Sequence, residues 1–277
     1  ASGMSGNHNV VLGYYAGGQI SSGEDNIALG RNSLAYSTTA NDNIAIGQYA
    51  SHRTGQYNAA NNTVVIGRYA GYYNQGNHNI FMGYYAGHGS SANAMSPGSD
   101  NVALGSSALQ NFISASKNVA IGRYALIDDR DGFGSVAVGY EAGRHATGSN
   151  NTFVGYLAGK GGTTTAPFSS GQNNTAMGYQ ALDAFTTGGS NIAIGYDALG
   201  VLSTASSNIA IGYQAMASAT TGGNMYNLAI GNGALQYYTT SGNGQNTIVG
   251  HQAGKGSSGN TTGEFNTSLG YYTLNAL

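Results

Sequence analysis

The sequence predicts an all-β protein, a β-solenoid of about fifteen short coils, and three observations predict it. One nine-residue motif, NIAIGYDAL at Asn191–Leu199, returns in strict or looser form along the whole chain. Successive copies are most often 17 residues apart, which suits one turn of a β-solenoid. Apolar residues alternate with Ala before the central glycine, with the period of a strand. We therefore predict one repeat domain that spans residues 1–277.

A central glycine marks every copy of the motif. The fifteen central glycines are Gly13, Gly30, Gly47, Gly67, Gly83, Gly105, Gly122, Gly139, Gly155, Gly178, Gly195, Gly212, Gly231, Gly250 and Gly270. Because the same residue recurs at a turn, we expect a backbone conformation that other residues tolerate poorly. Changing Gly195 to Ala should then cost about 1 kcal/mol or more.

A short strand is predicted before each central glycine, and a second one after it. The residues three and one before the glycine are apolar, as at Ile44 and Ile46, and we expect them to point inward and form the core. The residue between them is usually Ala, as at Ala193, and should then point outward. The second strand should end at the Ala-Leu of the motif.

Asparagine opens nearly every motif, four residues before the central glycine. Representative positions are Asn43, Asn118, Asn191 and Asn208. We predict a ladder of side-chain amides in which each amide bonds the neighbouring coils or caps the preceding turn.

The extra length of the longer coils always lies between two motifs, in segments rich in Gly, Ser, Thr and Asn. The insertions Ala92–Ser99, Gly161–Gln172 and Ser218–Asn224 are expected to project from one side and to carry partner contacts.

Tyrosine follows the central glycine directly in five consecutive coils. These tyrosines are the candidate ligand-binding residues Tyr140, Tyr156, Tyr179, Tyr196 and Tyr213. An exposed stripe of rings with polar tips would suit sugars or protein surfaces. The alternative is an aromatic ladder that packs in a subunit interface or against the next coil.

Composition argues against several classes of function. The net charge of −2 argues against nucleic-acid binding, and no apolar run approaches the roughly 20 residues that span a bilayer. The acidic segment Asp128–Gly132 has Arg in its middle and lacks the spacing of a calcium loop, which favours a solvated loop. The six histidines are scattered. No catalytic residue, cofactor or metal site is predicted, so we expect a protein that is not an enzyme.

A family resemblance rests on the motif itself. The run Asn-(Ile/Val)-Ala-(Ile/Leu)-Gly is similar to repeats in the YadA-like heads of trimeric autotransporter adhesins. The copy NTAMGYQAL at Asn174–Leu182 looks closer still to repeats of phage tail-fibre-like proteins. The resemblance implies a left-handed parallel β-roll, a homotrimer, and an extracellular location on a cell surface or virion. It also implies a spacer or receptor-binding role, with a host-surface glycan or protein as receptor.

The residues also favour lateral association. Each coil offers only two or three large apolar residues, and a stripe of outward alanines would suit close approach of another copy. Two other functions stay open at this point. A polysaccharide-degrading tailspike would need paired carboxylates, for which Glu24, Asp25 and Glu141 are available. An ice-binding solenoid would need a flat face of Thr, whereas Tyr, Arg, Gln and Asn flank the central glycines.

Overall fold

The computed structural model describes residues 5–52, 60–90, 96–162, 168–219, 226–239, 244–256 and 263–275. In these ranges the regular structure consists of three-residue β-strands joined by turns. The described residues include no helix that is long and apolar enough to cross a membrane. The all-β prediction is confirmed.

The chain divides into two compact units, Ala1–Ser135 and Val136–Leu277. The described strands of the first unit are β1 (Val10–Leu12), β2 (Ile27–Leu29), β3 (Ile44–Ile46), β4 (Val64–Ile66), β5 (Ile80–Met82), β6 (Val102–Leu104) and β7 (Val119–Ile121). Those of the second unit are β8 (Val136–Val138), β9 (Thr152–Val154), β10 (Thr175–Met177), β11 (Ile192–Ile194), β12 (Ile209–Ile211), β13 (Leu228–Ile230), β14 (Thr247–Val249) and β15 (Thr267–Leu269).

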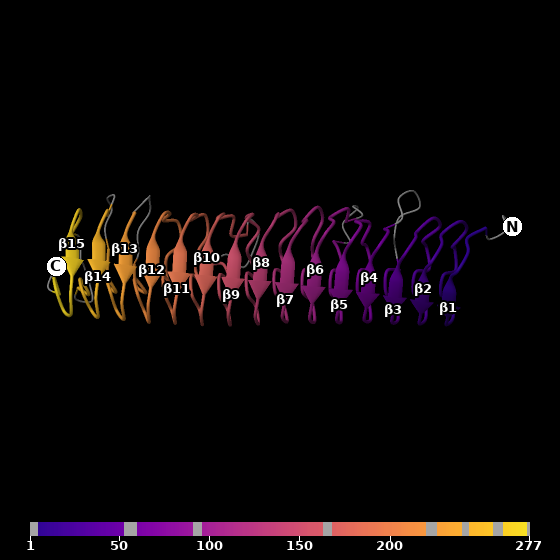
Figure 1. Cartoon of the computed structure of the whole chain (residues 1–277), viewed down its shortest axis with the longest axis horizontal. Coiled ribbons are helices and arrows are strands. Elements are labelled where there is room, and N and C mark those ends of the chain that lie inside the picture. The colour runs from indigo at the N-terminus through magenta and orange to yellow at the C-terminus, as the bar shows by residue number, and fades with distance from the viewer. Residues whose placement is uncertain are drawn as a thin grey trace. The chain divides into compact units, whose positions relative to one another are not determined.

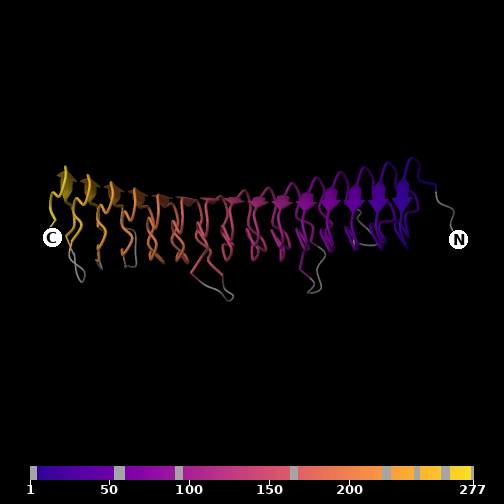
Figure 2. The same cartoon turned by 90° about the horizontal axis from the view of Figure 1, so that it is seen from below.

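Within each unit, every strand pairs in parallel with the next strand along the chain (Figure 1). The register places equal motif positions side by side, as in Ala28 beside Ala45 and Ala193 beside Ala210. Seen from below, the strands toward the end of the second unit lie along one edge of their coils, with the turns on the opposite side (Figure 2). The parallel β-solenoid predicted from the 17-residue period is confirmed, with one short strand in each coil.

The second strand expected after the glycine is absent from the described residues, so that prediction was wrong. The chain runs there through consecutive turns, because the residues two and four after the glycine adopt left-handed φ values, such as 53° at both Asp197 and Leu199. A strand cannot contain such residues. Their amides still bond the neighbouring coil, as the N–H of Leu199 does with the Ala215 carbonyl at 3.1 Å.

The central glycines behave as predicted. All fifteen have φ between 126° and 141°, a region that L-residues avoid, with 133° at Gly195. The coils also stack closely at this point. A Cβ on Gly195 would lie 2.7 Å from the carbonyl carbon of Gly212 and closer still to its oxygen. Glycine is therefore required both by the turn and by the approach of the next coil.

The orientation of the strands is the reverse of the prediction. The middle residue, Ala193 for example, is fully buried, whereas its neighbours Ile192 and Ile194 are half-buried on the outer side. The interior is narrow because the turns of the same coil close over the strand, and their Ala198 and Leu199 are also fully buried. Only a small middle side chain fits opposite them, so the branched residues lie outside.

The strand-middle position and the position four residues after the central glycine share one interior volume. Where the middle residue is Ala, as at Ala176, the second position holds a large residue, here Leu182. Where it is Phe153, the second position is Gly159, whose Cβ would lie 2.5 Å from Cγ of the Phe153 ring. In most coils the core is thus filled by one large and one small residue at these two positions.

The asparagine ladder is present as predicted. The Asn191 backbone N–H and side-chain amide donate to Oδ1 of Asn174, at 3.0 and 3.1 Å, and the amide also donates to the Ala205 carbonyl at 3.0 Å. Oδ1 of Asn191 in turn accepts from the backbone N–H and the side chain of Asn208, at 3.0 and 3.2 Å. Asn43 and Asn118 repeat this pattern with the preceding coil through Oδ1 of Asn26 and Oδ1 of Asn101.

Candidate functional site

The five candidate tyrosines form one continuous row in the second unit, which we call the tyrosine ladder. Neighbouring ring centroids are 5.3, 5.2, 5.0 and 5.0 Å apart along the row, and the planes are within 5–13° of parallel. Each ring directly follows a central glycine, so the parallel register stacks it on its equivalent in the next coil. Between 37% of Tyr140 and 50% of Tyr213 is exposed.

The ladder combines the two interpretations of the sequence, because the rings pack against the next coil and are also open to solvent. The stacked faces cover one another, so a sugar cannot stack on them from outside. What the ladder offers to a partner is a line of ring edges and hydroxyl groups.

Charged residues lie beside the tyrosine ladder. Glu141 is nearly buried, and its Oε1 forms an ion pair with Nη1 of Arg144 at 3.0 Å. Burial alone would raise the pKa of Glu141, but hydrogen bonds from Arg144 and Tyr140 outweigh burial and lower that pKa. Glu141 is therefore a paired, ionised carboxylate and is poorly suited to act as a general acid.

The sequence analysis did not single out the two carboxyl groups of Asp183 and Asp197, which lie on neighbouring coils. Burial and the nearby charge of Asp197 raise the pKa of Asp183 to about 6, while Lys160 opposes this shift. Burial also raises the pKa of Asp197, against the effect of a hydrogen bond from Gln214 at 3.4 Å. The only available signal was their position, five residues after one central glycine and two after the next.

The outer side of the strands forms a second surface, the aliphatic face. Each strand contributes its first and third residues, mostly Ile, Val and Leu, and the parallel register aligns them in two rows. Ile80, Met82 and Met177 are about two-fifths exposed. Thr occurs only in the first of the two rows, at Thr152, Thr175, Thr247 and Thr267, so no regular Thr array of an ice-binding type is present on the described strands.

A second aromatic row lies in the first unit, two residues after the central glycine. The rings of Tyr49 and Tyr69 are 5.0 Å apart and nearly parallel, and Tyr69 and Tyr85 follow at 5.1 Å. All three are half-buried. Arg68 lies over the ring of Tyr69 at 5.0 Å. Sequence reasoning did not single out this row, although the shared position in three consecutive coils was visible.

Histidines extend this aromatic cluster, five residues after the glycine. The His52 and Tyr72 rings stack at 4.8 Å, and Tyr72 and His88 stack at 5.3 Å. Burial lowers the pKa of His88, against a hydrogen bond between its Nδ1 and the Gly89 carbonyl. The cluster therefore favours the neutral form of His88.

Asp129 occupies a core position, which corrects the expectation of a solvated loop at Asp128–Gly132. It lies seven residues after the central glycine, where Phe112 and Leu202 fill other coils, and it is fully buried. Burial raises the pKa of Asp129 to about 7, and the charge of Asp131 adds to this shift. The backbone N–H of Gly132 donates to Oδ1 at 2.8 Å and opposes it.

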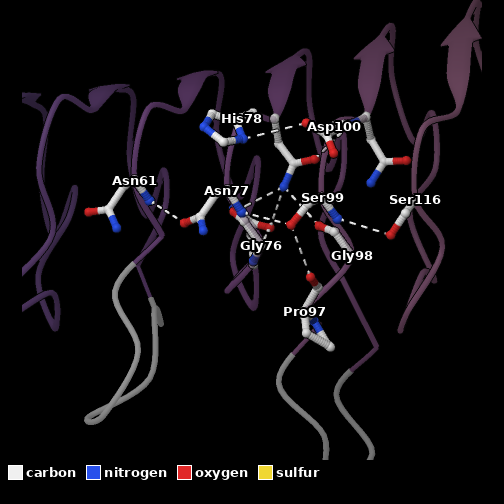
Figure 3. Close-up of polar contacts among 12 residues, drawn as sticks. Asn61, Gly76, Asn77, His78, Pro97, Gly98, Ser99, Asp100 and Ser116 are labelled. Atoms are coloured by element: carbon white, nitrogen blue, oxygen red, sulfur yellow. Dashed lines mark hydrogen bonds and ion pairs between the residues drawn. The ribbon is translucent and has the colours of Figure 1, made fainter.

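Two histidines pair with an aspartate of the following coil. Nδ1 of His8 lies 3.2 Å from Asp25, and Nδ1 of His78 lies 3.4 Å from Asp100 (Figure 3). Both pairs are exposed and take the same place in their coils.

A second polar ladder runs beside the His78–Asp100 pair. The backbone N–H of Asn61 donates to Oδ1 of Asn77, that of Asn77 to Oγ of Ser99, and that of Ser99 to Oγ of Ser116 (Figure 3). These contacts link coils and do not form a ligand site. Of the two neighbouring candidate carboxylates, Asp25 pairs with His8, and Glu24 accepts a hydrogen bond from Asn7 at 3.4 Å.

The insertions are described only at their ends. Ser96 and Ser169 are buried, and their hydroxyls donate to the Phe112 and Phe185 carbonyls, both at 2.8 Å. These ends thus belong to the wall of the coil. The projecting parts expected in Ala92–Ser99, Gly161–Gln172 and Ser218–Asn224 fall on residues 92–95, 163–167 and 220–224, which lie outside the described residues.

Among the described residues, no group of three or more His, Asp or Glu side chains is placed to hold a metal ion. Comparisons of this chain with protein-family models, with curated proteins and with solved structures give no significant match.

Proposed function

We propose that this chain is a non-enzymatic structural segment of an extracellular fibre, on a cell surface or a virion, which associates laterally with copies of itself. The observation that carries this proposal is the aliphatic face. Its side chains are large, branched and open on strand after strand, as at Ile192 and Ile194. An apolar surface of this extent is typical of an interface between proteins.

Lateral association would remove this surface from water. Fully burying one Ile or Leu side chain stabilises a protein by about 1.5–3 kcal/mol, and the β11 coil offers two half-buried ones. Identical chains present identical faces, so a closed symmetric assembly satisfies all copies equally. The resemblance to trimeric adhesin heads favours three subunits over two. The aliphatic face thereby takes the role that the sequence had assigned to an alanine stripe.

Light scattering and native mass spectrometry of the full chain test the assembly. We expect a homotrimer, and Ile194→Glu should shift it toward the monomer by placing a charge in the interface. Thr187→Glu adds the same charge at an exposed turn position and should leave the trimer intact. A wild-type chain that is monomeric at micromolar concentration would refute the proposal.

Receptor binding is assigned to the tyrosine ladder, with a host-surface glycan or protein as partner. The support is its line of exposed ring edges and hydroxyls along consecutive coils. If the hydroxyls make the contacts, Tyr196→Phe should weaken binding to immobilised host-surface glycans or proteins while the stack is retained. Binding that is unchanged in Tyr196→Phe would contradict this assignment.

The polysaccharide-degrading alternative has one supporting observation, the raised pKa values of Asp183 and Asp197 on neighbouring coils. Incubation with host capsular polysaccharide and measurement of reducing ends decides between the two functions. Release of reducing ends that Asp183→Asn abolishes would favour the hydrolase. No release is expected of a fibre segment.

A further inference from the structure

We propose that the tyrosine ladder is a modification site at which oxidation joins neighbouring coils through dityrosine bonds. Five phenols of consecutive coils are stacked with centroids 5.0–5.3 Å apart and planes within 5–13° of parallel. In such a stack equivalent ortho carbons are about as far apart as the ring centroids, so neighbouring rings must turn toward each other to couple. The rings are 37–50% exposed, so an oxidant reaches them and they can turn about the Cβ–Cγ bond.

The reaction balances with hydrogen peroxide, used by a haem peroxidase, as the oxidant. Two neighbouring phenols each lose one electron and the phenolic proton and become phenoxyl radicals. The radicals couple in one carbon–carbon bond between their ortho carbons, and the two ortho hydrogens move to the oxygens and restore both phenols. The pair has lost two hydrogen atoms, and one hydrogen peroxide has become two water molecules.

The composition directs one-electron oxidation to tyrosine. The chain contains 21 Tyr but no Trp and no Cys, so neither an indole nor a thiol competes for the electron loss. The six Met residues react by a different route, the transfer of an oxygen atom to sulfur. A chain without cysteine also has no disulfide to hold its coils together, and the ladder provides covalent links at equivalent places.

The geometry separates the ladder from the other tyrosines. Tyr14 is 76% exposed, but the next coil has Arg31 at the equivalent position, so no second phenol stacks on it there. The row of Tyr49, Tyr69 and Tyr85 is stacked but half-buried, and Arg68 covers part of it. The pairs Tyr84–Tyr85 and Tyr271–Tyr272 have ring centroids 4.4 Å apart, but each pair lies within one coil and meets edge to face, so a bond there would not join coils. Stacking between coils and access to an oxidant coincide in the tyrosine ladder.

Treatment of the dilute full-length chain with a haem peroxidase and limiting hydrogen peroxide tests the proposal. The intact mass of a single chain should fall by two hydrogen atoms per link, and peptide mapping should place the links between ladder neighbours. In Tyr179→Phe the ring still stacks but no phenoxyl radical forms at this place. Only the Tyr140–Tyr156 and Tyr196–Tyr213 links should then remain.

Tyr14→Phe is the matched control, because it removes an exposed phenol outside the ladder and should not change the yield. Circular dichroism spectra that superimpose on that of the wild type establish that both variants fold. The thermal unfolding midpoint of the treated wild type should rise, and that of a variant with all five ladder tyrosines changed to Phe should not. Links that form only between chains would overturn the proposal. So would equal yields from non-ladder tyrosines, or a yield that the variant with all five ladder tyrosines changed to Phe leaves unchanged.

Discussion

Exchanging Phe153 and Gly159 for the Ala and Leu that six other coils carry tests how the core is filled. In the β9 coil the large residue is on the strand and the small one in the turn, whereas Ala176 and Leu182 show the opposite arrangement in the next coil. We expect each single change to destabilise the protein. The double variant should recover most of the loss, because it converts one natural pair into the other.

The magnitudes follow from the packing. Phe153 is fully buried and its ring lies 5.6 Å from that of Phe185, so Phe153→Ala should lower the free energy of unfolding by about 3–5 kcal/mol. Gly159→Leu alone forces a side chain into the Phe153 ring and should cost about 1–3 kcal/mol or more. The backbone accepts the change, since φ is 54° at Gly159 and 53° at Leu182. The double variant should lie within about 1.5 kcal/mol of the wild type.

Guanidinium unfolding of the four proteins, followed by circular dichroism, gives the coupling free energy, which we expect to be about 3 kcal/mol in favour of the double variant. Because repeat proteins can unfold coil by coil, amide hydrogen exchange in the β9 coil should accompany the titration. A double variant as unstable as the sum of its two single changes would refute a shared interior volume.

Three further predictions follow from the coil. Gly195→Ala should lower the free energy of unfolding by denaturant by about 3 kcal/mol or more. Gly233→Ala, at φ 62° with only side-chain atoms nearby, should lower it by about 1 kcal/mol. Equal losses in the two variants would contradict the strain argument. Asn191→Ala removes the side chain that bonds the Ala205 carbonyl and the Asn208 backbone N–H of the following coil, and should lower the free energy of unfolding by about 2–4 kcal/mol. A loss under about 0.5 kcal/mol would contradict the ladder. The folded-state pKa of Asp129, about 7, exceeds the ordinary value of 3.8, so its stabilising contribution is complete below pH 3.8 and is lost as the pH rises to about 7. Asp129→Asn should remove this loss, and stability curves against pH that stay parallel for the two proteins would disprove it.

The repeat allowed most of the fold to be predicted. The 17-residue period, the alternation before the central glycine and the recurrent Asn each report a backbone requirement that every coil must meet. Backbone requirements of this kind depend on residue type alone. At Gly195 only glycine fits the turn, and at Asn191 the side-chain amide both donates to and accepts from its neighbours.

The candidate site was predicted in part, because stacking follows from register but contacts between different motif positions do not. Equal positions in successive coils must lie side by side, which placed the tyrosine ladder. The Glu141–Arg144 ion pair and the proximity of Asp183 to Asp197 depend on the path of the turns. That path contains left-handed residues at non-glycine positions, such as Leu199, and the indication in the sequence was the glycine at the equivalent position of other coils, as at Gly159 and Gly254.

The inward direction of the strand could not be decided from alternation, which places neighbouring residues on opposite sides without saying which side is the interior. Pairs of positions do decide it. Gly follows at the turn position wherever the strand-middle residue is large, as in Phe81 with Gly87 and Ile248 with Gly254. A large residue follows in most coils where it is small, as in Ala193 with Leu199, and the exceptions are the coils of Ala45 and Ala137. Such compensation arises only if both side chains compete for one enclosed volume, and a Cβ at Gly254 would indeed lie 3.2 Å from Cγ2 of Ile248. The middle residue must then point inward, and the branched residues beside it are left for the surface through which we propose that the copies associate.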